Sequence, residues 1–215
     1  MQRFDPRIRL PQFLTRYFPG AIWRAPANGN QVFLTFDDGP VPEVTPWVLD
    51  LLKKEQINAC FFCVGENVMK YPEIYRRILE ERHRVGNHTF NHLQGLKTPD
   101  ADYFSNVEKA AGYIESPFFR PPHGWMRRSQ FRQLRKQYQV VMWDLISRDY
   151  RNDVGPETIV RNVMDFVRPG SVIIFHDSYK AKTNLYKALP EVIRQLKMKG
   201  YQFGDLAQVD TKNNC

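Results

Sequence analysis

The stretch from Phe33 to Pro40, FLTFDDGP, runs through four mostly apolar residues and then places two carboxylates, Asp37 and Asp38, side by side. Adjacent like charges repel, and a carboxylate near the end of a buried strand is costly to desolvate unless a partner compensates it. One interpretation is a plain turn, because Asp-Gly-Pro is typical of turns and aspartate often caps a following helix. The other is a cation held by one carboxylate, with the second carboxylate left free for proton transfer. The rest of the sequence has to decide between them.

Outward from this stretch, short apolar runs of strand length alternate with helical patterns at intervals of roughly 25 residues, as a βα-barrel requires. The predicted strands are QVFLTF, ACFFCVG, HRVGNH, PFFR, QVVMWD, SVIIFH and YQFGDL. The predicted helices are PWVLDLLKKEQ, PEIYRRILEER, YFSNVEKAAGYI, PETIVRNVMDFV and LYKALPEVIRQLKMK, and Gly170 and Gly200 fall where helices should end before a strand. About seven βα units result, one or two fewer than a closed eightfold barrel has.

Length and charge narrow the class of protein. At 215 residues the chain suits one compact domain better than two. The net charge of +8 favours anionic surroundings, whether nucleic acid, membrane surface or cell-wall polymer. Because the lysines and arginines are spread along the chain rather than concentrated in one run, we interpret the charge as a solvated surface and expect no specific nucleic-acid binding.

Export and membrane insertion leave no signature in the sequence. No segment approaches the ~20 consecutive apolar residues of a transmembrane helix. The first residues, MQRFDPRIRLPQFLTRYF, lack the continuous apolar stretch and the cleavage site of a secretory signal peptide. We therefore expect either that the protein is cytoplasmic, or that it works in the cell envelope and its export signal is missing from this sequence.

The three cysteines, Cys60, Cys63 and Cys215, do not suggest a disulfide framework. Cys60 and Cys63 have the spacing of a redox motif, but their setting, INACFFCVG, is typical of a buried strand. Residues three apart on a strand face opposite ways. We therefore predict a structural role for both.

Residues capable of chemistry collect at the carboxyl ends of the predicted strands, which is where a parallel barrel places its active site. They are Asp37 and Asp38 after the first strand, His88 and His92 after the third, Arg120 after the fourth, Asp144 and Asp149 after the fifth, and His176 at the end of the sixth. Of the five histidines, only His83 lies outside these segments. A random scatter of such residues would not sort itself in this way.

His88 and His92 are four residues apart, so in a helical turn they would share a face and could hold one metal ion. With Asp38 the set becomes two imidazoles and one carboxylate. Three protein ligands and an open position are the pattern of catalytic zinc, and the same set suits other divalent ions. A cation there would neutralise one aspartate and depress the pKa of its neighbour, which favours the cation interpretation of FDDGP.

Arg120 and His176 each have a structural and a catalytic interpretation. Arg120 lies in RPP, whose prolines stiffen the backbone and fix the direction of the guanidinium, but it could also be a surface arginine that caps a helix. His176 closes the apolar run SVIIFH, and a buried histidine is usually a satisfied core residue. Beside a metal site at the carboxyl end of a strand, we interpret it as a general acid.

Five motifs, TFDDGP, HTFNH, RPPHG, WDLISRDY and IFH, closely resemble in order and spacing those of the polysaccharide deacetylases. These are chitooligosaccharide and peptidoglycan N-deacetylases, a family of metal-dependent amide hydrolases. The resemblance implies an α/β fold, a distorted (β/α) barrel of about seven parallel strands. It places the deacetylase domain at residues 31–206, between an N-terminal extension over residues 1–30 and a tail over residues 207–215. Apolar residues and arginines mix from Arg3 to Tyr17, and we expect this amphipathic basic segment to pack on the barrel rather than lie on a membrane.

The resemblance also implies a role for individual residues. Asp37 corresponds to the catalytic base, and Asp38, His88 and His92 correspond to the ligands of a divalent metal, zinc before cobalt, nickel, manganese or iron. The supporting residues are Arg120, which would orient the base, Asp149, which would partner the catalytic acid His176, and Ile174, which would line the pocket for the acetyl methyl.

Two positions depart from the family pattern. His123 stands where a tyrosine is usual, and Tyr150 stands where tryptophan is common. The backbone N–H at His123 could still supply an oxyanion donor. Trp125 and Tyr150 are candidate stacking surfaces for a sugar ring, although an aromatic side chain near a barrel rim is as often plain packing.

The function implied is a metal-dependent hydrolase that removes N-acetyl groups from amino sugars in a saccharide or cell-wall polymer. One alternative is an esterase that removes O-acetyl groups with the same machinery. A second is a saccharide-binding protein that kept the barrel without catalysis, although intact candidates for the metal, base, arginine and acid argue against it. Nucleic-acid binding through net charge is the third.

Overall fold

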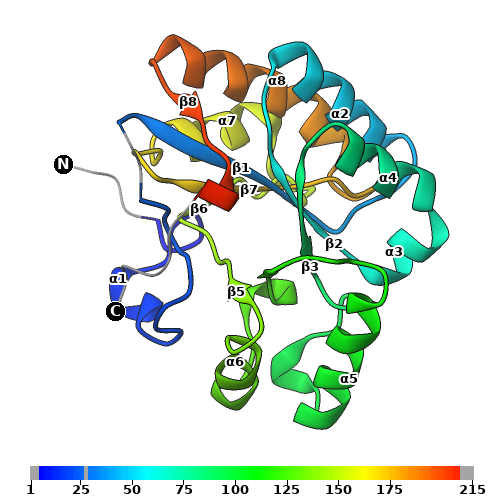
Figure 1. The fold of residues 1–215 in the computed structure, drawn as a ribbon. Helices are drawn as coiled ribbons and strands as arrows, with labels where there is room; N and C mark the ends of the chain where they lie inside the picture. The colour runs from blue at the N-terminus through cyan, green and yellow to red at the C-terminus, as the bar shows by residue number, and fades with distance from the viewer. Residues whose placement is uncertain (1–4, 27–28, 209–215) are drawn as a thin grey trace.

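The structure is a computed structural model that describes residues 5–26 and 29–208. The ends of the predicted extension and tail, residues 1–4, 27–28 and 209–215 with Cys215, lie outside the described residues. A parallel sheet curls through the centre of the molecule, and helices cover its outer side (Figure 1). In the described ranges, no helix has both the length and the apolar character needed to cross a membrane.

The sheet confirms the predicted α/β class and the distorted barrel. Seven strands run in the order β5-β4-β3-β2-β1-β7-β6, and β8 pairs with the beginning of β1. Every pair is parallel. The bounds are β1 Gln31–Asp37, β2 Cys60–Cys63, β3 Arg84–Asn87, β4 Phe118–Phe119, β5 Gln139–Val140, β6 Leu145–Ile146, β7 Val172–His176 and β8 Gln202–Phe203. No pairing joins β5 to β6, so the barrel is open on that side.

The segment predicted as one strand, QVVMWD, divides between two neighbours. Val141 donates its N–H to the carbonyl of Phe119, but Asp144 donates its N–H to the carbonyl of Val172, on the other side of the opening. The next residues form β6 by pairing with β7. Asp149 therefore follows β6, which the sequence analysis did not predict, because a run of two paired residues has no periodicity to detect.

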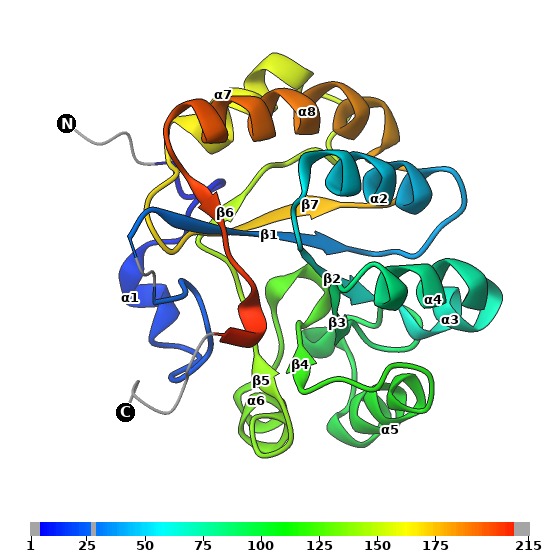
Figure 2. The same ribbon diagram turned by 45° about the horizontal axis from the view of Figure 1, so that its top comes forward.

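The five predicted helices are all present. They are α2 Val44–Glu55, α4 Pro72–Glu80, α5 Asp100–Ala111, α7 Pro156–Met164 and α8 Lys182–Met198. Pro72 and Pro156 occupy first helical positions, where a missing N–H removes no intrahelical bond. The shorter helices α1 Gln12–Thr15, α3 Gly65–Lys70 and α6 Arg128–Leu134 were not predicted, since fewer than two turns give little helical period. Figure 2 shows α7 and α8 on one side of the sheet and α5 and α6 on the opposite side.

Strand β1 shows how the core and the site are divided. Its residues from Val32 to Asp37 are all buried, as expected for a parallel strand covered on both faces. Val32, Leu34 and Phe36 belong to the main apolar cluster, together with the inner faces of α2 and α8. Alternate residues point the other way, so Thr35 and Asp37 face the interior of the barrel. Cys60 and Cys63 are free thiols buried in the neighbouring β2.

The N-terminal segment lies along the opening between β5 and β6. Ile22 donates its N–H to the carbonyl of Val140 and accepts a hydrogen bond from the N–H of Met142, at 2.8 and 2.7 Å. Nearer the start of the chain, the carbonyl of Ile8 accepts the N–H of Ile146 at 3.0 Å. The side chains of Ile8 and Phe18 are buried. The segment thus supplies backbone partners to both sides of the opening.

Candidate active site

A cavity of about 460 Å³ opens at the carboxyl ends of the strands. Most of the residues that the sequence analysis selected line it: Asp37, Asp38, His88, His92, Arg120, His123, Tyr150, Ile174 and His176. Asp149 lies beneath the cavity and reaches it through His176. Parallel strands end at one edge of the sheet, so residues at the ends of five strands, β1, β3, β4, β6 and β7, contribute side chains to a single site.

Three of these side chains offer ligand atoms to one point. Oδ1 of Asp38 lies 3.1 Å from Nε2 of His92 and 3.7 Å from Nε2 of His88. The ligand atoms of all three residues lie within 4.8 Å of one another. Nδ1 of His88 faces the carbonyl oxygen of Arg120 at 2.7 Å, which fixes the ring and leaves Nε2 for an ion. This donor set fits a divalent metal ion.

The backbone that presents the ligands differs from the predicted helical turn. Residues 88–92 form an irregular loop, and Thr89 and His92 have left-handed backbone angles, with φ of 65° and 58°. Asp38 is also left-handed, with φ of 80°. The loop is held by a hydrogen bond from the Thr89 N–H to Oδ1 of Asn87, at 2.8 Å. Non-glycine residues in this region are uncommon and gather at functional sites, and here they turn both histidines toward Asp38.

Electrostatics keeps two of the ligands, His88 and Asp38, in the protonation states that metal binding needs. Burial lowers the pKa of His88 to about 4, so its imidazole is neutral. Burial alone would raise the pKa of Asp38, but a hydrogen bond from His92 and the nearby imidazoles of His176 and His88 hold it well below its usual range. A neutral imidazole and an ionised carboxylate are the forms that ligate metals.

Arg120 joins the site to the barrel interior. Its Nη1 donates to Oδ1 of Asp37 at 2.6 Å and to the hydroxyl of Thr35 at 2.8 Å. Nε and Nη2 donate to the carbonyls of Val141 and Met142. The side chain is only 1% exposed, which excludes the interpretation as a surface helix cap. A buried guanidinium with this many acceptors is rigid, so it fixes the position of the Asp37 carboxylate.

His176, which is partly buried, and Asp149, which is fully buried, form an ion pair on the opposite wall. Nδ1 of His176 lies 2.8 Å from Oδ1 of Asp149, and the backbone N–H of His176 donates to Oδ2 at 2.8 Å. Ser147 donates its hydroxyl to Oδ1 of Asp149. Burial alone would lower the pKa of His176, but Asp149 outweighs it and raises the pKa to about 9. The imidazole is therefore protonated at neutral pH, with Nε2 as the nitrogen available to the cavity.

Apolar and aromatic side chains complete the wall. Ile174, Ile146 and Trp143 line the cavity together. The ring of Tyr150 lies edge-on to that of His176, with centroids 4.8 Å apart, and the ring of His123 lies in the same way against His92, at 4.7 Å. Tyr150 is thus in contact with the proposed acid His176, and His123 is in contact with the proposed metal ligand His92.

Two selected residues lie outside the site. Trp125 does not line the cavity, because its ring packs against those of Tyr17 and Phe18, at 6.1 and 6.3 Å. The tryptophan that lines the cavity is Trp143, which the sequence analysis did not select. Asp144 does not reach the cavity either. It precedes β6 and accepts hydrogen bonds from Arg168 and Ser171, so it belongs to a structural cluster at the other end of the strands.

One residue was missed altogether. Asp177 is buried, and its Oδ1 accepts the N–H of Gly39 while its Oδ2 accepts the hydroxyl proton of Thr45, at 3.1 and 2.6 Å. From the other side, the amide of Asn67 donates to the carbonyl oxygen of Asp38 at 2.8 Å. The turn that carries both active-site aspartates is clamped between these two side chains. Its signal in the sequence was a carboxylate directly after His176, just past the end of β7, the strand that pairs with β1.

Comparison with known proteins agrees with this geometry. Residues 24–143 match the family model described as polysaccharide deacetylase. A peptidoglycan-N-acetylglucosamine deacetylase from Bacillus cereus is 33% identical over 195 residues, which cover 87% of this chain and 91% of the relative. A chitooligosaccharide deacetylase from Bradyrhizobium sp. is 31% identical over 219 residues, with 93% and 98% covered. The crystal structure of the Bc1960 peptidoglycan N-acetylglucosamine deacetylase superposes with a TM-score of 0.85 at 32% identity, over 95% of this chain and 98% of that one.

Proposed function

The chain belongs to the polysaccharide deacetylase family, and from that premise we propose that it is a metal-dependent hydrolase that removes N-acetyl groups from amino sugars in a saccharide or cell-wall polymer. One observation carries the proposal. A single cavity holds a three-residue metal site, a carboxylate fixed by a buried arginine, and a protonated histidine. Amide hydrolysis needs these parts together, since it requires an activated water, a proton acceptor and a proton donor.

The residues at the metal site would be Asp38, His88 and His92. We propose zinc as the ion, with cobalt, nickel, manganese and iron as alternatives, because two imidazoles and one carboxylate with an open position suit all of them. When bound, such an ion polarises the amide carbonyl and lowers the pKa of water. The support for zinc is the chemistry of the donor set.

Asp37 serves as the base in this proposal. It lines the cavity next to the ligand Asp38, and Arg120 keeps it oriented through the 2.6 Å hydrogen bond. Asp37 accepts a proton from the water as that water attacks the acetyl carbonyl carbon. A backbone N–H near His123 donates to the oxygen that becomes negatively charged.

His176 serves as the acid. An amine leaves poorly unless its nitrogen is protonated, so the C–N bond breaks as Nε2 of His176 gives up its proton to that nitrogen. Asp149 holds the imidazole in place through Nδ1 and favours its protonated form. Ile174 contacts the acetyl methyl on the apolar wall. The products are acetate and a free amino sugar.

Acetate release across a panel of substrates tests the proposal. The panel contains N-acetylglucosamine oligomers, peptidoglycan fragments and acetyl-xylan, assayed with the metal present, after its removal by a chelator, and after it is added back. We expect metal-dependent release from the N-acetylated substrates. Release from acetyl-xylan alone would make the protein an O-acetyl esterase. Saccharide binding without any acetate release, in protein that contains metal, would make it a non-catalytic barrel.

A further inference from the structure

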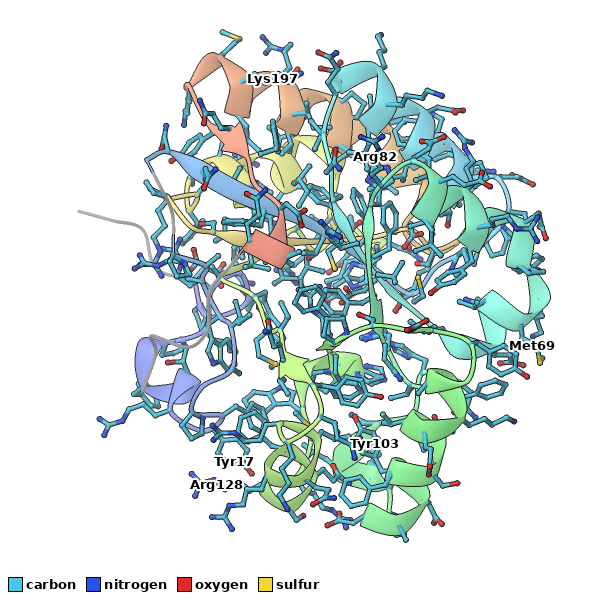
Figure 3. The ribbon with its side chains drawn as sticks, viewed as in Figure 1. Tyr17, Met69, Arg82, Tyr103, Arg128 and Lys197 are labelled. Atoms are coloured by element: carbon cyan, nitrogen blue, oxygen red, sulfur yellow. The ribbon has the colours of Figure 1, made fainter. Side chains whose placement is uncertain are left out.

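A second hollow, of about 200 Å³, lies between the N-terminal segment and α6. None of its lining residues lines the active-site cavity. Four arginines surround it: Arg16 from the N-terminal segment, and Arg128, Arg132 and Arg135 from α6 and its end. Figure 3 shows Tyr17 and Arg128 side by side there, at the lower edge of the molecule. We refer to this feature as the arginine hollow.

In the described part of the chain, the four arginines have no acidic partner. Within residues 5–26 and 29–208, no ion pair with a carboxylate involves any of them. Other arginines do pair with carboxylates: Arg7, Arg9, Arg77, Arg84, Arg120, Arg127, Arg151, Arg168 and Arg194. The sequence contributes to this imbalance, because residues 116–143 contain no aspartate or glutamate. Like charges gathered around one hollow repel one another, and no carboxylate of the described residues pairs with these four.

Two of the guanidinium groups are already held in position. That of Arg128 lies 4.6 Å from the ring centroid of Tyr17. That of Arg135 lies 5.6 Å from the ring centroid of Phe131 and donates to the carbonyl oxygen of Pro19 at 3.2 Å. Arginine stacks in this way on aromatic faces and keeps its other N–H groups free to donate. A ligand would lose less side-chain entropy on binding to such groups than to freely moving ones.

We propose that the arginine hollow binds phosphate groups. The planar fork of arginine matches the oxygens of a phosphate, and a bound anion would relieve the repulsion among the four cations. The phosphate could be a free ion or the headgroup of an anionic lipid. Phe13, on α1 shortly before Arg16, is 69% exposed, and an exposed aromatic residue beside arginines is typical of surfaces that contact anionic bilayers. The proposal does not depend on the deacetylase assignment.

Thermal unfolding of the full chain in inorganic phosphate tests the site. Ionic strength is held constant with chloride, so that only specific binding raises the melting temperature. Within residues 5–26 and 29–208, no hydrogen bond or ion pair involves the Arg132 side chain, so Arg132→Gln removes a cation of the hollow without breaking a described polar interaction. Arg76→Gln is the matched control, since Arg76 is exposed on α4 and forms no ion pair with any residue that the structure describes.

We expect phosphate to stabilise the wild type and Arg76→Gln equally. In Arg132→Gln the phosphate affinity should fall roughly tenfold or more, as expected for the loss of a charged hydrogen bond. Without phosphate, Arg132→Gln should melt at the wild-type temperature or above it, because removing one cation relieves repulsion. If Arg132 instead stabilised the fold, Arg132→Gln would lower the melting temperature in the absence of phosphate.

Cosedimentation with vesicles distinguishes the two sources of phosphate. Binding to phosphatidylglycerol vesicles but not to phosphatidylcholine vesicles, weakened by both Arg132→Gln and Phe13→Ser, would support the lipid headgroup. Stabilisation by inorganic phosphate without vesicle binding would support a free phosphate. The proposal is overturned if Arg132→Gln and Arg76→Gln behave alike toward both inorganic phosphate and phosphatidylglycerol vesicles.

Discussion

The carboxylate of Asp177 lies against the peptide of Gly39. Its Oδ1 accepts the Gly39 N–H at 3.1 Å, and a Cβ atom on Gly39 would stand only 2.0 Å from its Oδ2. Gly39 and Asp177 are far apart in the sequence, and they meet because β1 pairs with β7. The contact connects the strand that ends in the proposed acid to the turn that carries the proposed base and metal ligand.

This contact predicts that Asp177 supports metal binding indirectly, by holding the turn that carries the ligand Asp38. Asp177→Ser should lower metal affinity by about 10- to 100-fold, the usual cost of removing a residue that supports a ligand. Thr45→Val should act in the same direction, because the Thr45 hydroxyl donates to Asp177, while Thr45→Ser should keep the affinity. Affinity is measured by competition with a chelator. Asp144→Asn is the control, a buried carboxylate in a cluster away from the cavity, and equal losses in Asp144→Asn and Asp177→Ser would contradict the prediction.

Asp37 and Asp38 should fail in different ways when each becomes asparagine. Asp38→Asn replaces an anionic ligand with a neutral amide, so metal content should drop and added metal should partly restore activity. Asp37→Asn should keep the metal and lose about 10²- to 10⁴-fold in rate, the contribution of a general base. Elemental analysis alongside acetate release measures both. Equal metal loss in the two variants would show that the division of roles is wrong.

The pairing of His176 with Asp149 predicts a shift in pH dependence. The folded pKa of His176, about 9, lies above the ordinary value of 6.5, so the pairing stabilises the protein fully below about pH 6.5, and this contribution is lost as pH rises through 9. The acid should likewise stop working as pH rises through that value. Asp149→Asn should move the alkaline limb of the pH–rate profile to lower pH. If Asp149→Asn is active and its alkaline limb does not move, Asp149 does not set the pKa of the catalytic acid.

Ile174 should select for the acetyl group. It lines the cavity and is almost fully buried, so Ile174→Ala should enlarge the apolar wall. One methylene in such a pocket is worth about 1–3 kcal/mol, so the preference for acetyl over propionyl should fall roughly 10- to 200-fold. The ratio of the two release rates measures the effect. A ratio that does not move would make Ile174 an ordinary core residue.

Periodic and motif-borne features were predictable from the sequence. These features are apolar runs such as SVIIFH and the amphipathic patterns of the five longer helices. They depend on residues close together in the chain, so they can be predicted from short windows of sequence. Strand-end positions were predictable for the same reason, and they brought Asp38, His88 and His92 to one edge of the sheet. That placement came from topology rather than from any local helix between the histidines.

The sequence by itself determined the barrel class, the family resemblance and the side chains that would gather at the strand ends. Only the tertiary structure decided that Trp143 rather than Trp125 lines the cavity, that Asp144 belongs to a structural cluster, and that Asp177 clamps the turn of β1. Each of these depends on contacts across the sheet between residues far apart in the chain. Hydrophobic period and local propensity report only near neighbours, so they carry no information on which of two similar side chains a distant strand will meet.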